Sequence, residues 1–96
     1  MTVRTLATLV FRLMAELEQI HSYRLEQRLA NLLLLRASTA GELRMTQQQM
    51  ADHLGTTREV VARLMRDFVA SRYVETRRSL TLIRDARGLA RVISPG

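Results

Sequence analysis

The side chains best suited to chemistry in this sequence lie within one segment, from Thr57 to Arg66. Arg58, Arg63 and Arg66 carry guanidinium groups, and Glu59 carries a carboxylate. Arginine donates two parallel hydrogen bonds to O6 and N7 of guanine, and glutamate accepts one from N4 of cytosine. These residue types, closely spaced on one expected helix, indicate contact with base edges in duplex DNA.

Catalytic and metal-binding sites lack the residues that they need. The chain contains no cysteine, and its two histidines, His21 and His53, do not have the spacing of metal ligands. No serine has a plausible base and orienting group in its sequence context. We therefore expect neither an enzyme nor a protein that holds a metal or another cofactor.

The charge of the chain favours an anionic partner. Its 96 residues carry a formal net charge of +6, and all of its basic residues are arginine. Arginine suits phosphate and guanine because its planar group forms paired hydrogen bonds, although a genome-wide arginine bias would equally explain the absence of lysine. No apolar run is long enough to span a membrane, and Arg12 and Glu16 interrupt the pattern of a signal peptide. The lack of cysteine fits a cytoplasmic protein.

The strongest pattern in the sequence is a helix-turn-helix between Gln47 and Arg66. Ala51 is small enough to let two helices approach, Gly55 permits the positive φ of a tight turn, and Val61 fixes the second helix against the first. This arrangement is typical of a DNA-binding motif whose second helix enters the major groove.

Capping residues define the two helices of this motif. Thr46, with Gln49 three positions later, predicts a capping box at the start of the first helix, which ends near His53. Thr56, with Glu59 three positions later, predicts a second capping box at the start of the second helix. Such a cap would not prevent Glu59 from also contacting a base.

A two-stranded hairpin is expected after the motif. The stretches Tyr73–Arg77 and Leu80–Arg84 are strand-like, and Arg78-Ser79 lies between them. Ser38–Met45 is expected to be a loop, and Asp85–Ile93 a short terminal helix. The predicted fold is therefore mainly α with a small β-hairpin wing, a winged helix-turn-helix preceded by a long dimerisation helix.

The N-terminal helix, Val3 to about His21, has a heptad pattern of apolar residues typical of a two-stranded coiled coil. Valine occupies the a position and leucine the d position of the first two heptads. Packing of this helix on its own domain is the alternative, because Leu9, Phe11 and Met14 widen the apolar face. We expect a homodimer formed through the seam residues, which are Val3, Leu6, Val10, Leu13, Leu17 and Ile20.

A second helix is expected from about Tyr23 to Ala37, because leucines recur along one face. Neither proline nor glycine separates it from the first helix, so a bend near Ser22 and one continuous helix both remain open. We divide the chain into a dimerisation helix, residues 1–22, and a winged helix-turn-helix domain, residues 23–96.

The sequence also resembles a known family. The stretch MTQQQMADHLGTTREVVARLMRDFVASRYVETRRSLTLIRDARGL is similar to the winged-helix domain of the Crp/Fnr family of bacterial transcription regulators. RLEQRLANLLLL resembles the helix that leads into that domain, and the heptad helix resembles the family's central dimerisation helix. The most specific part of the resemblance is LGTTREVVARLMRDF.

The resemblance implies how DNA would be read. The family's base-reading positions fall on Arg58, Glu59 and Arg63, a combination closer to the cyclic-AMP-receptor branch than to the oxygen-sensing branch. We therefore expect guanines opposite Arg58 and Arg63. A homodimer would place two recognition helices in successive major grooves of a palindromic duplex, about 34 Å apart, and RNA polymerase is a further partner that the family implies.

Other positions match contacts to the DNA backbone. Thr57 and Gln48 match phosphate-contacting positions, Thr46 lies at the entry to its helix, and arginines of the wing supply further phosphate contacts. The full set of candidate DNA-binding residues is Thr46, Gln48, Thr57, Arg58, Glu59, Arg63, Arg66, Arg77 and Arg78.

Two departures from the family qualify this expectation. Arg78-Ser79 stands at the wing turn where the family usually has a glycine, and this leaves the strand register open. The chain also has no segment for the family's N-terminal β-barrel sensor domain, so we expect either a fragment of a longer regulator or a stand-alone dimer. An alternative function is a protein-interaction module whose leucine seam pairs with a full-length regulator.

Overall fold

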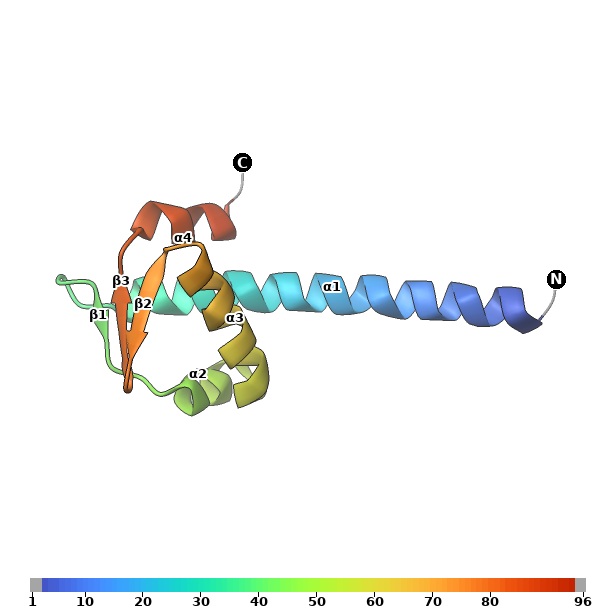
Figure 1. Cartoon of the computed structure of the whole chain (residues 1–96), viewed down its shortest axis with the longest axis horizontal. Helices are drawn as coiled ribbons and strands as arrows, with labels where there is room; N and C mark the ends of the chain where they lie inside the picture. The colour runs from blue at the N-terminus through green and yellow to red at the C-terminus, as the bar shows by residue number, and fades with distance from the viewer. Residues whose placement is uncertain (1–2, 95–96) are drawn as a thin grey trace.

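The computed structural model describes residues 3–94, and its elements follow the predicted order apart from one additional short strand (Figure 1). A long helix runs away from a small domain that gathers around its second half. The elements are α1 (Val3–Arg36), β1 (Glu42–Leu43), α2 (Gln47–Leu54), α3 (Arg58–Ala70), β2 (Val74–Arg77), β3 (Leu80–Ile83) and α4 (Ala86–Ile93). The prediction of a mainly α winged helix-turn-helix is confirmed.

α1 is one continuous helix, which decides between the two alternatives that the sequence left open at Ser22. The helix passes through Ser22 without a break because no residue there lacks a backbone N–H or carries the flexibility of glycine. Every residue from Val3 to His21 is exposed, whereas burial begins at Leu25. The boundary placed between residues 22 and 23 therefore falls within a helix. The side chains change from exposed to buried near this point, but the backbone remains helical.

The domain core is built from leucine, methionine and valine around one phenylalanine. Leu29 and Leu33 of α1 are fully buried, and they belong to the same apolar cluster as Met50 of α2, Phe68 of α3 and Leu89 of α4. Each buried aliphatic side chain of this size contributes about 1.5–3 kcal/mol. The second half of α1 is thus an integral part of the winged helix-turn-helix domain.

The sheet has three antiparallel strands in the order β1-β3-β2. β1 was not expected, since it lies within the segment Ser38–Met45 that was predicted to be a loop. Leu43 is buried, and the amide of Ile83 donates to the carbonyl of Gly41 at 2.8 Å. A strand of two residues is too short to show a period in the sequence. β1 is a strand only because it pairs with β3.

The turn of the helix-turn-helix forms largely as predicted. Thr46 is the N-cap of α2, and both hydrogen bonds of its capping box with Gln49 are present. Gly55 ends α2 with φ of 70°. The second cap is Thr57 and not Thr56, so the predicted capping box with Glu59 is wrong. The amide of Thr56 instead donates to the carbonyl of Ala51 at 3.0 Å, which assigns Thr56 to the end of α2.

The hairpin register is fixed by the pairing of Arg77 with Leu80, which leaves Arg78-Ser79 as a two-residue turn. Each strand is shorter by one residue than predicted. Ser79 has φ of 55°, a conformation that glycine adopts more easily. The wing therefore forms without the usual glycine, at some cost in backbone strain.

α4 is docked through a close contact with the beginning of the hairpin. Asp85 is its N-cap, where its side chain accepts a hydrogen bond from the amide of Gly88. A β-carbon at Gly88 would collide with the ring of Tyr73, so only glycine allows this approach. At the other end of α4, the side-chain amide of Gln27 donates to the backbone carbonyl of Ile93 at 3.2 Å. Within residues 3–94 no helix is apolar enough over sufficient length to cross a membrane.

Candidate nucleic-acid interface

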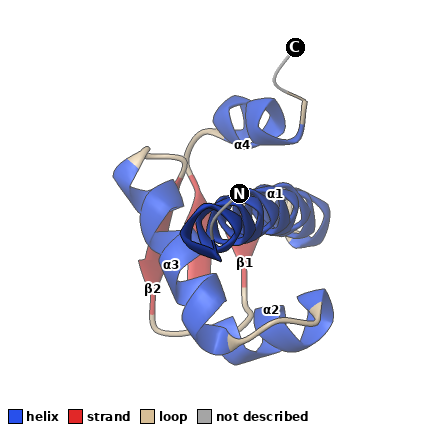
Figure 2. Ribbon diagram, turned by 90° about the vertical axis from the view of Figure 1, so that its right-hand side faces the viewer, coloured by secondary structure: helices blue, strands red, loops and turns tan. Residues whose placement is uncertain are grey.

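One side of the domain carries α2, the start of α3 and the tip of the β2–β3 hairpin. In Figures 1 and 2 these three elements lie on the side opposite to α4, and this side faces sideways from the axis of α1. Winged helix-turn-helix domains use the equivalent elements to contact the groove and the flanking backbone. The structure therefore brings the candidate DNA-binding residues of the sequence to one side of the domain. Arg63 is the exception, because its side chain points towards α1.

A cleft of about 510 Å³ connects the helix-turn-helix to the wing. Arg58 at the start of α3 and Arg77 at the end of β2 both line it, together with Gln48 and Ser79. No acidic residue lines this cleft. Two guanidinium groups in one cleft without a carboxylate create a positive potential that favours phosphate. The structure thus joins residues that are far apart in the sequence.

The two threonines expected at the DNA backbone are both helix caps. The hydroxyl of Thr46 accepts from the amide of Gln49 at 3.0 Å, and the hydroxyl of Thr57 accepts from the amide of Val60 at 3.3 Å. Both residues are exposed. A hydroxyl that accepts a hydrogen bond still has its own proton to donate. Capping and a phosphate contact are therefore compatible at both positions.

Gln48 is held by a neighbour that the sequence reasoning did not consider. Its side-chain amide donates to Asp52 at 2.8 Å, one turn further along α2. One amide proton remains for a phosphate, but the carboxylate of Asp52 places a negative charge beside it. The spacing of four residues on a helix could have revealed this pair in the sequence.

Three of the remaining candidates, Glu59, Arg66 and Arg78, are exposed. Glu59 lies in the first turn of α3 and takes no part in a capping box, so its carboxylate is free of that role. Arg66 lines a groove of about 360 Å³ with Thr76 of β2. These positions extend the charged surface from the start of α3 towards the wing.

Arg63 differs from the other candidates because it points towards α1. Its Nη2 donates to Oγ of Ser22 at 3.0 Å, although the two residues are 41 positions apart. One turn further along both helices, Glu26 of α1 lies near Asp67 of α3. Partial burial of Glu26, and then the charge of Asp67, raise the pKa of the Glu26 carboxyl. Sequence reasoning missed Ser22, since only the crossing of α1 and α3 brings it to Arg63.

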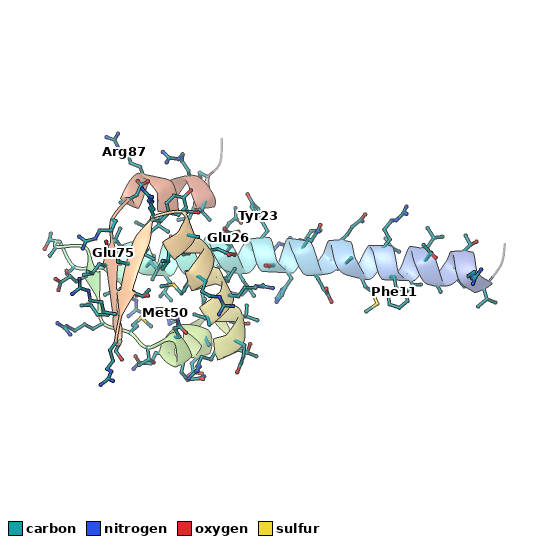
Figure 3. The ribbon with its side chains drawn as sticks, viewed as in Figure 1. Phe11, Tyr23, Glu26, Met50, Glu75 and Arg87 are labelled. Carbon is teal, nitrogen blue, oxygen red and sulfur yellow. The ribbon has the colours of Figure 1, made fainter. Side chains whose placement is uncertain are left out.

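The predicted dimerisation seam lies on the free half of α1. Its apolar side chains are all exposed, from 48% at Val10 to 85% at Val3. Phe11, outside the seam, is 75% exposed and projects from the same free half (Figure 3). Within the described chain, every residue of α1 from Val3 to His21 is exposed, and only its last turn, at Glu18 and His21, comes close to α3.

Comparisons with known proteins agree with this geometry. Residues 27–92 match the family model described as a Crp-like helix-turn-helix domain. A comparison with curated protein sequences found no match.

Solved structures of known regulators have the same fold. The catabolite activator protein of Thermus thermophilus has 23% sequence identity and a TM-score of 0.79, and the match covers 94% of this chain and 43% of that protein. DNR from Pseudomonas aeruginosa has 19% identity and a TM-score of 0.81, with coverage of 92% and 41%.

A structure from Eubacterium rectale, described as a transcriptional regulator of the crp/fnr family, has a higher identity of 33%. Its TM-score is 0.70, and the match covers 92% of this chain and 42% of that protein. The chain thus spans less than half the length of each of these structures. Because the family model covers more than half of the chain, the protein belongs to the Crp/Fnr family of transcription regulators, of which it contains the DNA-binding winged helix-turn-helix domain.

Proposed function

We propose that this protein binds duplex DNA sequence-specifically as a homodimer and thereby regulates transcription. The observation that carries the proposal is the cleft that is lined by both Arg58 of the recognition helix and Arg77 of the wing and by no acidic residue. A phosphate backbone beside a major groove offers the matching negative charge. RNA polymerase is a further expected partner of such a regulator, and the cytoplasm, where bacterial DNA lies, is its expected location.

Base reading is assigned to Arg58, Glu59 and Arg63. Arg58 and Glu59 occupy the first turn of α3, the part of a recognition helix that reaches base edges. Arg63 lies one turn further on and is exposed, so it can contact DNA once its hydrogen bond to Ser22 is released. The resemblance to the family implies guanines opposite Arg58 and Arg63, and the bidentate geometry of arginine is compatible with that contact.

Dimerisation is assigned to the seam from Val3 to Ile20. Monomeric proteins rarely expose a continuous apolar stripe of this length, and valine at a with leucine at d in the first two heptads favours a parallel pair. The two-fold axis of such a pair runs along α1. The alternative, in which the seam packs on its own domain, loses support because α1 continues straight and carries the seam away from the core (Figure 1).

This dimer has a geometric consequence for DNA binding. The side with α2, the start of α3 and the wing faces sideways from α1 (Figure 1). A two-fold axis along α1 would point the two copies of this side in opposite directions. Both copies can then read one palindromic duplex only if the domain turns relative to the seam, and the unbroken helix at Ser22 opposes that turn.

The test is a binding-site selection with Arg63→Ala, compared with Arg87→Ala as a matched control. Arg87 is exposed on α4 and projects away from α2 and the wing (Figure 3). Arg63→Ala should weaken binding to the selected site by about 1–3 kcal/mol and relax the preference at one base pair. Arg87→Ala should leave the motif and the affinity nearly unchanged. An unchanged motif with Arg63→Ala would contradict the assignment.

A second candidate function is pairing with a full-length regulator, which would give an inactive heterodimer. The exposed seam on α1 is the observation that favours it. A gel-shift assay with random-sequence duplexes separates the two functions. Binding that resists competitor DNA supports the regulator, whereas the absence of any shift at low salt by the folded protein supports the interaction module.

A further inference from the structure

The face of α1 that carries the seam continues beyond Ile20 into the domain. Further residues follow at steps of three or four, namely Arg24, Arg28, Asn31 and Leu35. In a straight α-helix this spacing keeps side chains on one face, and α1 is continuous and nearly straight over this length (Figure 1). The seam is therefore extended by a basic stretch and then by one leucine.

The far end of this face has the form of a groove between α1 and α2. The groove measures about 260 Å³ and is lined by Arg28, Asn31 and Leu35 of α1 and by His53 and Leu54 of α2. Leu35 is 73% exposed, although it belongs to a helix half whose other leucines pack into the core. Leu35 lies on the same helix face as the apolar seam, beyond the basic stretch, so a partner helix that follows this face would cover it as well.

The arginines in the middle of this face have no negative partner. The ion pairs among residues 3–94 are Arg84–Glu75 and Arg91–Asp85, and neither involves this face. No acidic residue lines the groove at Arg28. Along the face, Glu16 precedes Arg24 by about 12 Å along the helix axis; both residues line one shallow hollow, but they form no ion pair. Arg24 and Arg28 thus carry two uncompensated positive charges.

Building on the dimer proposed above, we propose an oxyanion site on its two-fold axis, formed by Arg24 and Arg28 with the partner subunit's Arg24 and Arg28. In a parallel pair, Arg24 occupies an a position and faces the same residue of the other helix. Four guanidinium groups would then surround one point between the layer of Ile20 and the layer of Leu35. The site is incomplete without the second copy.

The chemistry of these groups selects the ligand class. Like charges that face one another across a coiled coil repel and weaken the pair. A compact anion with two or more negative charges, bound between the arginines, would replace this electrostatic repulsion by a net attraction. Phosphate fits because its tetrahedral oxygens can accept bidentate hydrogen bonds from several guanidinium groups at once. Inorganic phosphate, or the phosphate group of a small ester, is therefore the expected class of ligand.

Analytical ultracentrifugation at constant ionic strength tests the site, with inorganic phosphate or pyrophosphate replacing chloride. The dimer dissociation constant should fall by about tenfold or more in phosphate, because the anion binds the dimer and not the monomer. Pyrophosphate acting as strongly as phosphate would indicate a site open enough for phosphate esters; phosphate acting alone would indicate a closed site for the free ion. Either response supports the proposal.

Variants distinguish phosphate binding at this site from a general effect of salt ions on the repulsion between the two helices. The double variant Arg24→Gln and Arg28→Gln should dimerise more tightly in chloride and lose the phosphate response. Arg24→Leu should also tighten the dimer, since it extends the apolar seam. The matched control is Arg12→Gln, an exposed arginine of α1 outside this face, which should keep the full response. A wild-type dimer that is equally stable in chloride and phosphate overturns the oxyanion site alone. A monomer under every condition overturns the proposed dimer together with the site.

Discussion

Arg63 of α3 donates a hydrogen bond to Ser22 of α1 at 3.0 Å, and this bond links a candidate base-reading side chain to the helix that carries the dimerisation seam. Both side chains lie at the point where α1 leaves the domain core. The contact holds the guanidinium group of Arg63 against protein and away from an incoming duplex. Under the base-reading role proposed for Arg63, DNA would compete with Ser22 for this arginine.

Replacement of Ser22 by alanine should strengthen DNA binding. The variant removes the competing acceptor, and a hydrogen bond of this kind contributes about 0.5–1.5 kcal/mol, which corresponds to an affinity gain of roughly two- to tenfold. Fluorescence anisotropy with a selected duplex at fixed salt measures the change. Ser94→Ala, an exposed serine at the end of α4, is the control. Weaker or unchanged binding by Ser22→Ala would mean that Arg63 does not contact DNA.

Replacement of Asp52 by asparagine should strengthen binding to every duplex, whatever its sequence. Asp52 accepts from Gln48 at the expected backbone contact, and its charge repels phosphate at short range. Removing one exposed charge should improve the affinity by a few-fold, or about 0.2–1 kcal/mol. The comparison is anisotropy with selected and random duplexes over a salt series. Glu16→Gln, on the free half of α1, is the control. A gain confined to the selected sequence would show that Asp52 acts on base reading.

Replacement of Arg72 by glycine should stabilise the domain. Arg72 has φ of 63° in the residue after the α3 cap. The amide of Tyr73 bonds to the carbonyl of Phe68, and the amide of Arg72 bonds to the carbonyl of Val69. This is the pattern of a Schellman motif, in which glycine is favoured. The gain should be about 1 kcal/mol, measured by urea unfolding. Arg72→Ala removes the same side chain but keeps the strain, so it should not stabilise the domain.

The proximity of two carboxylates, those of Glu26 and Asp67, predicts that the stability of the domain depends on pH. Burial and the nearby Asp67 raise the pKa of Glu26 above its ordinary value of 4.5. The folded state therefore binds a proton more readily than the unfolded state, and the contribution of Glu26 to stability falls as pH rises through the region above 4.5. Glu26→Gln should abolish this contribution and raise the stability at neutral pH by about 0.5 kcal/mol.

Chemical denaturation of wild type and Glu26→Gln across this pH range measures the difference between their stabilities. The difference should grow as pH rises and then level off. Asp67→Asn should reduce it, because the two carboxylates share one interaction and their effects should not add. A difference that is constant with pH would contradict a raised pKa at Glu26.

The sequence by itself determined the features that depend on local spacing. The small residue Ala51, the glycine at the turn and the capping box at Thr46 each need only neighbours along the chain, and all three formed as predicted. The heptad seam and the hairpin could be predicted for the same reason, because apolar residues that recur with periods of 3.5 and 2 can be recognised in the sequence alone. Local spacing placed the recognition helix, but the candidate site residues on α2, α3 and the wing were selected mainly through the resemblance to the Crp/Fnr family.

Only the tertiary structure decided the features that depend on contacts between distant segments. The two-residue strand β1 exists because β3 pairs with it. The cap of α3 at Thr57, by contrast, is set locally, because the amide of Thr56 donates to the carbonyl of Ala51 and completes the end of α2. The continuity of α1 at Ser22 was left open because no local signal favoured a break. The crossing of α1 and α3 then set the hydrogen bond of Arg63, whose type and spacing had indicated DNA but not a partner 41 positions earlier.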